Sequence, residues 1–340
     1  MTSRSDLMQR AMQPALVFES GCIAETLRTL PLPFILLAQP EPLQLLPADA
    51  RGRAATARIP PSLARRSLED MEATLPEARA VVGIGGGSAM DAAKYVAWRR
   101  GTALYLAPSI ISVDAFVTNT IAVRDEGQVH YDGFVVANKV LVDFDLIHQA
   151  PPHLNRAGVG DLLSIHTALW DWEHGSDRES VPFDAEFAAR ARRTLRQVTA
   201  AAASIRDVTD AGLETVVRAY AEVNALCLLA GSSAPEEGSE HYFAYLLERL
   251  TGRSFIHGEV IALGVMLMSA LQRNDVSGIR AAIHETGVRW RPEDLRIGRD
   301  DLVRTLLGLR DFVREAALPW SVVDEADLTR TVAESLVNSL

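Results

Sequence analysis

The sequence contains little cysteine, no long apolar run and no excess of basic residues. Among its 340 residues there are only two cysteines, Cys22 and Cys227, which lie far apart and in no metal-ligand spacing. We interpret both as buried apolar residues of a protein in a reducing compartment. The longest apolar run, residues 260–271, is too short to span a bilayer and predicts a buried helix. Residues 1–4 lack the apolar stretch of a signal peptide, so we expect a cytoplasmic protein.

The balance of charge argues against some partners. The 34 basic and 44 acidic side chains give a net charge of −10. We therefore expect no nucleic acid and no membrane as a partner, and an anionic substrate would need a local basic pocket. The apolar share of 48% is typical of a globular protein, and the length exceeds what one domain usually needs.

Residues 1–150 alternate between short apolar runs and helical patterns. The apolar runs predict strands at residues 34–38, 80–84, 103–106 and 140–143, and the patterns between them predict helices at residues 23–30, 61–75 and 89–100. Residues 120–136 alternate apolar and polar side chains around Asp125-Glu126-Gly127, which predicts a hairpin. Apolar strands separated by helices indicate a parallel sheet that is covered on both faces.

Strand signals nearly vanish after Pro151-Pro152, which we interpret as a domain boundary. Amphipathic patterns then predict helices at residues 183–205, 208–229, 240–250, 260–271, 300–316 and 325–337. The sequence thus predicts an α/β domain with a Rossmann-like parallel sheet at residues 1–150, followed by an all-α domain at residues 151–340.

The first chemical signal is the sequence Gly85-Gly86-Gly87-Ser88, which follows a predicted strand and enters a predicted helix. We call these four residues the glycine turn. Consecutive glycines let a ligand approach the backbone, and a helix start offers free N–H groups and a positive dipole, which suit a pyrophosphate. Ser88 is the expected N-cap, with Asp91 completing something like a capping box. The alternative is a purely structural strand-to-helix turn.

The second chemical signal combines one carboxylate with two imidazoles. Asp161 follows the small residues 157–160, where we expect a turn and the start of a helix, and His241 and His257 come later in the chain. This set of side chains suits zinc or a related divalent ion with a position left open for substrate. The helix predicted directly after His257 favours the neutral imidazole that binds a metal. The alternative is an N-cap aspartate with two ordinary histidines.

Several short motifs occur in the order of a known superfamily. They are Gly85-Gly86-Gly87-Ser88 with Asp91 and Lys94, then Pro108, Ser112-Val113-Asp114-Ala115, Gly158-Val159-Gly160-Asp161, Gly238-Ser239-Glu240-His241 and His257-Gly258-Glu259. Over residues 14–275 the chain resembles the superfamily of glycerol dehydrogenases, glycerol-1-phosphate dehydrogenases and iron-containing alcohol dehydrogenases, whose fold is dehydroquinate synthase-like. Residues 158–172 look most like the glycerol-1-phosphate dehydrogenase branch.

The resemblance implies roles for these residues. Asp161, His241 and His257 would be catalytic residues that hold a metal, Zn²⁺ or another divalent ion such as Fe²⁺ or Ni²⁺. The glycine turn would hold the pyrophosphate of NAD or NADP, and the cofactor would be lined by Asp91, Ser109, Ser112 and Thr118. Asp114 would be a catalytic residue near the nicotinamide and the substrate. The four-ligand iron subtype has a histidine where this chain has Ile165, so the three-ligand subtype fits better.

The resemblance also implies a division of labour and an assembly. Residues 1–150 would bind the nucleotide, residues 151–340 would bind the metal and the substrate, and the protein would be a homo-oligomer, a dimer or larger.

Two departures from the superfamily pattern bear on specificity. Glycerol-1-phosphate dehydrogenases carry Arg-Pro before the Gly-Ser/Ala-Glu-His stretch, whereas this chain has Ala234-Pro235-Glu236-Glu237. Acidic neighbours in place of a cation would weaken a phosphate site, so glycerol 1-phosphate, a related phosphate or phosphonate, and an uncharged polyol all stay open. The first predicted strand ends at Ala38-Gln39-Pro40, without the acidic residue that binds a ribose 2′-hydroxyl, so NAD and NADP both stay open.

Together these observations predict a metal-dependent, NAD(P)-linked dehydrogenase that interconverts a small polyol, phosphorylated or not, and its carbonyl form. The ion would act as a Lewis acid on the alcohol oxygen while hydride passes to the cofactor. Asp114, Ser164 and His166 are candidates to carry the released proton. The alternative enzyme is a sugar-phosphate cyclase like 3-dehydroquinate synthase, which typically has a glutamate in place of Asp161. A third interpretation is a non-catalytic family member, and the presence of all three ligands counts against it.

Overall fold

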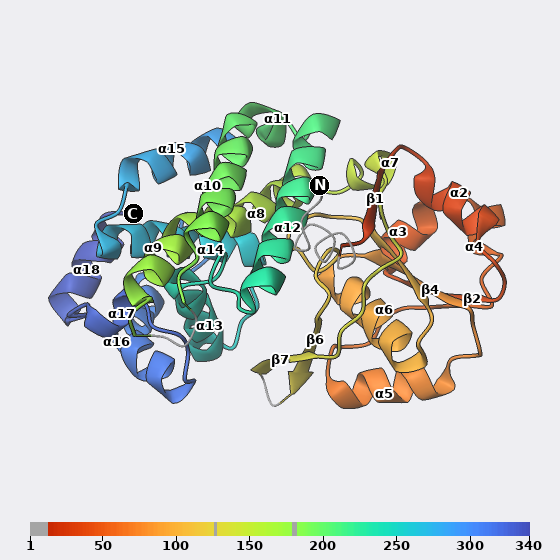
Figure 1. Ribbon diagram of the computed structural model, residues 1–340, viewed down its shortest axis with the longest axis horizontal. Coiled ribbons are helices and arrows are strands. Elements are labelled where there is room, and N and C mark those ends of the chain that lie inside the picture. Colours follow the sequence, from red (N-terminus) through yellow and green to blue (C-terminus); the bar gives the residue numbers. More distant parts are fainter. Residues whose placement is uncertain (1–12, 126–127, 179–181) are drawn as a thin grey trace. The chain divides into compact units, whose positions relative to one another are not determined.

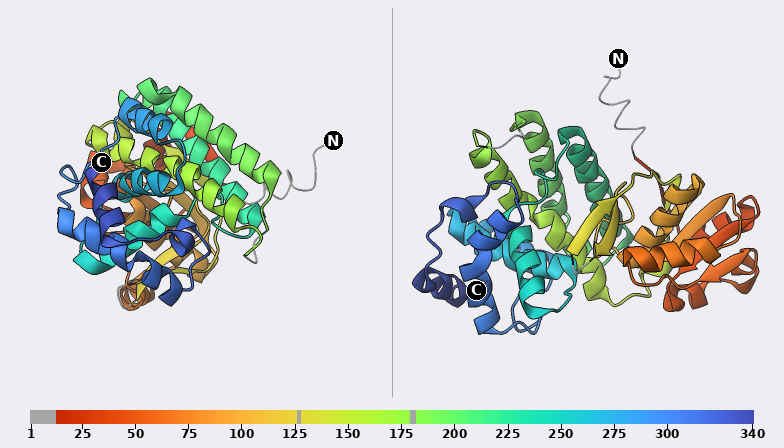
Figure 2. Two further views of the ribbon diagram at one scale, coloured as in Figure 1. Left: turned by 90° about the vertical axis from the view of Figure 1, so that its left-hand side faces the viewer. Right: turned by 90° about the horizontal axis from the view of Figure 1, so that it is seen from below.

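The computed structural model describes residues 13–125, 128–178 and 182–340 of the chain. The chain divides into two compact units, unit 1 from Met1 to Asn155 and unit 2 from Arg156 to Leu340. Figures 1 and 2 show strands in unit 1, whereas the described residues of unit 2 form helices and connecting segments only. The predicted succession of an α/β region and a helical region is therefore confirmed.

Six strands of unit 1 form one parallel sheet. Strands β1 (Ala15–Phe18), β2 (Phe34–Ala38), β3 (Thr56–Arg58), β4 (Ala80–Gly85), β5 (Ala103–Pro108) and β8 (Lys139–Val142) lie in the order β1-β8-β5-β4-β2-β3. The chain runs outward from β2 to the edge strand β3 and then returns to the other side of β2, where β4 and β5 follow. In doubly wound sheets such a reversal opens a crevice at the carboxyl ends of the strands. The glycine turn begins at the carboxyl end of β4, at this reversal.

The four predicted strands of the sheet are confirmed, and two edge strands were missed. β3 consists of the short sequence Thr56-Ala57-Arg58, two residues of which are exposed, so it gives no apolar signal. The predicted hairpin is confirmed as the antiparallel pair β6 (Ile121–Asp125) and β7 (Gln128–Asp132), with residues 126–127 of its turn outside the described residues. Arg65 forms ion pairs with Asp125 and Asp132 and so clamps both strands of the hairpin.

Helices cover both faces of the sheet, as predicted. The helices of unit 1 are α2 (Cys22–Thr29), α3 (Pro40–Leu45), α4 (Ala48–Arg51), α5 (Arg65–Thr74), α6 (Gly87–Arg100) and α7 (Phe144–Ile147). Ile23 and Leu27 of α2 pack in one apolar cluster with Leu36 of β2. On the opposite face, a Cβ atom on Gly83 of β4 would lie 2.6 Å from Cβ of Ala93 in α6. Helix α6, which follows the glycine turn, therefore packs tightly on the strand before it.

Unit 2 is a bundle around one largely buried helix, α14 (His257–Gln272). Its helices are α8 (Pro152–Leu163, which crosses the unit boundary), α9 (Ile165–Gly175), α10 (Ala185–Ala200), α11 (Ala202–Arg206), α12 (Asp210–Ala230), α13 (Ser239–Thr251), α14 (His257–Gln272), α15 (Val276–Thr286), α16 (Arg299–Glu315), α17 (Val322–Glu325) and α18 (Arg330–Asn338). Every residue of α14 from Gly258 to Ser269 is buried, which confirms the helix that the apolar run predicted.

The prediction of a turn at residues 157–160 was wrong. These residues lie inside α8, which begins at Pro152. A proline is well tolerated in the first turn of a helix, because the N–H group that it lacks would have no helical partner there. Asp161 consequently lies in the last turn of a helix and is not an N-cap. The helix predicted at residues 325–337 corresponds to α18, which begins five residues later than predicted, whereas the single helix predicted at residues 183–205 is in fact two helices, α10 and α11.

Two smaller features complete the fold. Cys22 is buried, as predicted, whereas Cys227 is only half-buried. In the described part of the chain, every helix is too short or too polar to cross a lipid bilayer.

Candidate functional site

Two glycines bring helices α8 and α14 into backbone contact. A Cβ atom on Gly160 would lie 1.8 Å from the carbonyl oxygen of Gly258, and a Cβ atom on Gly258 would lie 1.8 Å from the carbonyl oxygen of Ala157. Only glycine permits so close an approach. Because Asp161 follows Gly160 and His257 precedes Gly258, the contact places these two candidate ligands beside each other.

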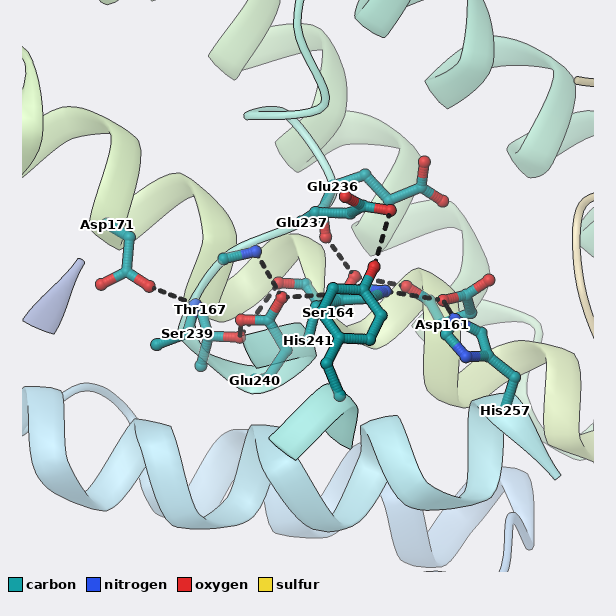
Figure 3. A network of polar contacts seen from close by, with 12 residues as sticks. Asp161, Ser164, Thr167, Asp171, Glu236, Glu237, Ser239, Glu240, His241 and His257 are labelled. Atoms are coloured by element: carbon teal, nitrogen blue, oxygen red, sulfur yellow. Dashed lines mark hydrogen bonds and ion pairs between the residues drawn. The ribbon is translucent and has the colours of Figure 1, made fainter. Parts of the chain in front are cut away.

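Asp161, His241 and His257 converge at this contact (Figure 3). Oδ1 of Asp161 is 3.3 Å from Nε2 of His241 and 3.2 Å from Nε2 of His257. One ligand atom from each residue lies within 4.8 Å of the other two. Asp161 and His241 are buried, whereas the side chain of His257 is 35% exposed. The three residues come from α8, from the first turn of α13 and from the start of α14, so tertiary packing alone assembles them.

The electrostatics of this cluster fit a divalent cation. Burial alone would raise the pKa of the Asp161 carboxyl, but the charge of His257 and hydrogen bonds from both histidines lower that pKa below its ordinary value. Burial alone would lower the pKa of His241, but its hydrogen bonds with Asp161 and Glu240 raise that pKa well above the ordinary value. The buried carboxylates thus draw positive charge to the site, and one divalent ion could supply that charge in place of protons. A carboxylate with two imidazoles also matches the donor set of catalytic zinc sites, which keep a position open for substrate.

Acidic and hydroxyl side chains surround the three ligands. Oε1 of Glu240 accepts a hydrogen bond from Nδ1 of His241 at 2.8 Å. The hydroxyl of Tyr245 donates to Glu237 at 3.4 Å, and the ring of Tyr245 lies 6.0 Å from the ring of His241. Ser164, a candidate proton carrier, is fully buried, and its hydroxyl lies within hydrogen-bond distance of two backbone carbonyl oxygens. Ser164 is therefore better explained as a helix-packing residue than as a proton carrier.

The glycine turn has the geometry that its residues predicted, but its cap differs. The N-cap of α6 is Gly86, and no side chain caps this helix, so the capping box predicted for Ser88 and Asp91 is wrong. Gly85 has φ +148°, a conformation that favours glycine, and a Cβ atom on it would lie 2.6 Å from Oε1 of Gln39. Ser88 is exposed at the start of α6, where first-turn N–H groups lack helical partners and can bind an anion. These features fit a nucleotide pyrophosphate.

Gln39 supports the glycine turn from the end of the neighbouring strand. Its Oε1 accepts a hydrogen bond from the backbone N–H of Gly86 at 2.8 Å, and its Nε2 donates to Oγ of Ser88 at 3.2 Å. Gln39 therefore occupies the position where related folds carry a ribose-binding carboxylate, and its neutral amide supports the glycine turn.

The other predicted cofactor residues fall into two groups. Ser109 donates its backbone N–H to the carbonyl oxygen of Gly85 at 2.8 Å, which ties the end of β5 to the turn. The loop of Ser112 and Asp114 also lies against the turn, because a Cβ atom on Gly87 would be 3.1 Å from Cγ1 of Val113. Asp91 and Thr118 instead contact the buried ammonium group of Lys94. Nζ of Lys94 is 2.7 Å from Oδ1 of Asp91 and 3.1 Å from Oγ1 of Thr118.

The fold and the site together define a class of enzyme. A family model described as iron-containing alcohol dehydrogenase matches residues 49–151. The crystal structure of a probable glycerol dehydrogenase from Sinorhizobium meliloti has a TM-score of 0.72 to this chain, with 96% of each chain covered and 21% sequence identity. The parallel sheet of unit 1 and the helices of unit 2 thus form the fold of this class.

The more specific assignment comes from curated relatives. A glycerol-1-phosphate dehydrogenase (NAD(P)+) from Hyperthermus butylicus is 30% identical over 274 residues, which cover 80% of this chain and 77% of the relative. Another, from Cenarchaeum symbiosum, is 30% identical over 261 residues, 76% of this chain and 72% of the relative. The chain belongs to the glycerol-1-phosphate dehydrogenase family of the iron-containing alcohol dehydrogenases. It is an NAD(P)-linked polyol dehydrogenase, so the predicted enzyme class and nicotinamide cofactor are confirmed.

Three residues that shape the site were not predicted from the sequence. Glu240, Thr167 and Gln39 each bond to a candidate site residue or to its neighbour. The signal for Glu240 was its place directly before a candidate metal ligand, since metal-binding histidines usually bond a carboxylate or carbonyl through the other ring nitrogen. Thr167 and Gln39 gave no such signal.

Proposed function

We propose that unit 2 holds a divalent metal ion at Asp161, His241 and His257, and that the glycine turn of unit 1 holds NAD or NADP. The substrate would be a small polyol without a phosphate group. Such a polyol and NAD(P)+ give the carbonyl compound, NAD(P)H and one proton. The observation that supports the metal site is the convergence of three ligand atoms within 4.8 Å of one another, in a chain of a dehydrogenase family.

Several residues of the chain would hold and orient the metal ion and the nicotinamide cofactor for this reaction. A divalent ion, when bound, supplies a Lewis acid for the oxygen that is oxidised or reduced. Glu240 orients the imidazole of His241, and burial keeps water from Asp161 and His241. His257, the partly exposed ligand, marks the side from which a substrate can enter. In unit 1, Gln39 braces the backbone that would face the cofactor phosphates.

The charges around the ligands favour an uncharged substrate. Glu237 and Glu240 both act electrostatically on His241 and raise its pKa, as does the hydrogen bond that His241 donates to Asp161. Two negative charges on a phosphate would be repelled by these acids at short range. The names of the relatives make glycerol 1-phosphate the competing substrate.

Replacing His257 tests the metal site. Because His257 is partly exposed at the start of a helix, His257→Ala should fold, lose its bound zinc and lose at least about 10³-fold in kcat/KM. The matched control is His174→Ala, which removes an exposed histidine of the same unit that stacks on Trp170, and which should keep both properties. Full activity and zinc content in His257→Ala would refute the site.

A substrate panel tests the rest of the proposal. Glycerol and glycerol 1-phosphate, each with NAD+ and NADP+, are assayed before and after removal of metal with a chelator. We expect turnover to need metal and kcat/KM to be higher for glycerol. A tenfold or larger preference for glycerol 1-phosphate would reject the uncharged substrate, while dependence on metal would still support the metal site.

A further inference from the structure

Glu240 is a carboxylate with no exposure to solvent, directly beside a candidate metal ligand. It makes three hydrogen bonds. Its Oε1 accepts from the backbone N–H of Gly238 at 2.7 Å and from Nδ1 of His241 at 2.8 Å, and its Oε2 accepts from the hydroxyl of Thr167 at 2.6 Å. Figure 3 shows these bonds on the side of His241 that faces away from Asp161.

Burying this charge is not explained by stability alone. A buried charge costs free energy that its partners often fail to recover, and a neutral isostere usually satisfies the same bonds at a lower cost. A glutamine at position 240 could accept from Gly238 and His241 through its carbonyl oxygen. A functional reason for the negative charge of Glu240 is therefore an effect on a neighbouring ionisable group. His241 is such a group, and it is in contact with Glu240.

The bond between Glu240 and His241 decides which ring nitrogen can bind a metal. A carboxylate only accepts hydrogen bonds, so Nδ1 of His241 carries the proton in this contact. In a neutral imidazole the lone pair then lies on Nε2, the atom that faces Oδ1 of Asp161 at 3.3 Å. A charged acceptor on Nδ1–H also makes Nε2 more basic, and hence a stronger ligand.

Two neighbouring elements hold Glu240 in place. Thr167 belongs to α9, and its hydroxyl fixes Oε2. Asp171, one turn further along α9, accepts the backbone N–H of Ser239 at 2.8 Å and so anchors the start of α13. A Cβ atom on Gly238 would lie 2.8 Å from Oδ2 of Asp171 and 3.2 Å from Oε2 of Glu240, so the chain has little freedom to move between the two carboxylates.

We propose that Glu240 is a positioning residue that orients His241 through Nδ1–H and whose negative charge strengthens Nε2 of His241 as a ligand, and that it thereby sets the affinity of the site for a divalent ion. This inference rests on the proposed function, since it needs a metal at Asp161, His241 and His257. It adds a carboxylate–histidine–metal relay, with Thr167 as the outermost member.

The test compares Glu240→Gln with Asp171→Asn, two neutral replacements of buried carboxylates on the same network. Zinc affinity is measured by competition with a chromophoric chelator, the ligand field by the visible absorption of the Co²⁺-loaded protein, and folding by circular dichroism. We expect Glu240→Gln to fold, to bind zinc about 10- to 100-fold more weakly and to shift the Co²⁺ bands. Both oxygens of Asp171 accept backbone N–H groups, so the amide NH2 of Asp171→Asn would face a donor and this variant should melt at a lower temperature. It should bind zinc like the wild type, because Asp171 contacts no candidate metal ligand.

The possible results separate the two levels of the proposal. Wild-type zinc affinity and an unshifted Co²⁺ spectrum in Glu240→Gln would overturn the positioning role and leave the proposed function standing. Equal losses of affinity in both variants would overturn it too, because they would show a general effect of folding. A wild-type protein that binds no divalent ion would overturn both the relay and the proposed metal site.

Discussion

The two units use glycine for opposite purposes, although the sequence presents both uses as small-residue motifs. In unit 1, the glycines of the glycine turn end a strand and begin a helix, where backbone N–H groups can face an anion. In unit 2, Gly160 and Gly258 lie in helices and let two backbones touch, with Cβ positions only 1.8 Å from carbonyl oxygens. The first use leaves room for a ligand, and the second removes room between helices. A glycine motif therefore marks a close backbone approach without revealing what approaches.

The difference extends to how each unit would bind its ligand. Unit 1 offers backbone groups, and side chains such as Gln39 serve to brace them. Unit 2 offers side chains, and a network of buried acids and hydroxyls holds them in position. We expect substitutions in unit 1 to change nucleotide binding without changing metal binding, and the reverse in unit 2.

The largest effect is expected where two backbones touch. In Gly160→Ala the new methyl group would overlap the carbonyl oxygen of Gly258, so α8 and α14 must separate, which should cost about 3 kcal/mol or more of unfolding free energy. Because Asp161 and His257 flank the contact, zinc binding should be lost as well. Thermal unfolding and zinc content measure both effects.

A matched control uses another glycine of the same unit. At Gly308 the nearest atom to an added Cβ is Cδ2 of Leu246 at 3.6 Å, an ordinary contact, so Gly308→Ala should be neutral or stabilise by up to about 1 kcal/mol. Equal stabilities of the Gly160→Ala and Gly308→Ala proteins would contradict the packing role of Gly160.

The next largest effect should come from the other kind of glycine. Gly85→Ala places a side chain at φ +148° and 2.6 Å from Oε1 of Gln39, which should distort the glycine turn. We expect nucleotide binding to weaken by about 10- to 100-fold, equivalent to about 1.4–2.8 kcal/mol, with zinc affinity unchanged. Fluorescence titration with NADH and NADPH measures the first quantity. A loss of zinc binding in this variant would break the comparison between the units.

A smaller effect should sharpen the comparison at Gln39. Gln39→Glu keeps the side-chain length and the acceptor for Gly86 but adds a negative charge at the end of β2. A carboxylate there accepts the ribose 2′-hydroxyl of NAD and repels the 2′-phosphate of NADP. The ratio of kcat/KM for NAD to that for NADP should rise about tenfold. An unchanged ratio would show that the ribose 2′ group of the cofactor does not lie near residue 39.

The smallest effect concerns the polar network of unit 2. Burial and the charge of Glu240 raise the pKa of Asp171 to about 7, so the folded protein holds this proton more tightly than the unfolded chain. The contribution of Asp171 to unfolding free energy must therefore fall as pH rises from about 4 to about 7. Between pH 5 and pH 8 the wild type should lose roughly 1 kcal/mol more than Asp171→Asn in denaturant unfolding. Parallel pH profiles would show that Asp171 does not titrate in this range.

The regular parts of the fold were predictable because their signals are local. The run at residues 34–38 is apolar throughout and became the fully buried strand β2 with the predicted bounds. The edge strand β3 was missed because its exposed residues need no apolar pattern. Residues 157–160 predicted a turn because glycine is common in turns, and the helix α14 whose close approach requires Gly160 comes about a hundred residues later in the chain.

The convergence of the three candidate ligands was predictable, but the residues that support them were not. Asp161, His241 and His257 were found through the order of motifs, which a sequence preserves. Which side chain contacts which is a property of packing, and the bond between Thr167 and Glu240 joins positions 73 apart. No local pattern announces such a pair.

Asp171 of α9 connects two segments that lie far apart in the sequence. Asp171 accepts the N–H of Ser239 with one oxygen and the N–H of Val322, the first residue of α17, with the other, each at 2.8 Å. The segment near the end of the chain is thus tethered, through a single side chain, to the loop that presents His241. Removing α17 would release this tether, which should lower the stability of the fold around His241 while the candidate metal ligands stay in place.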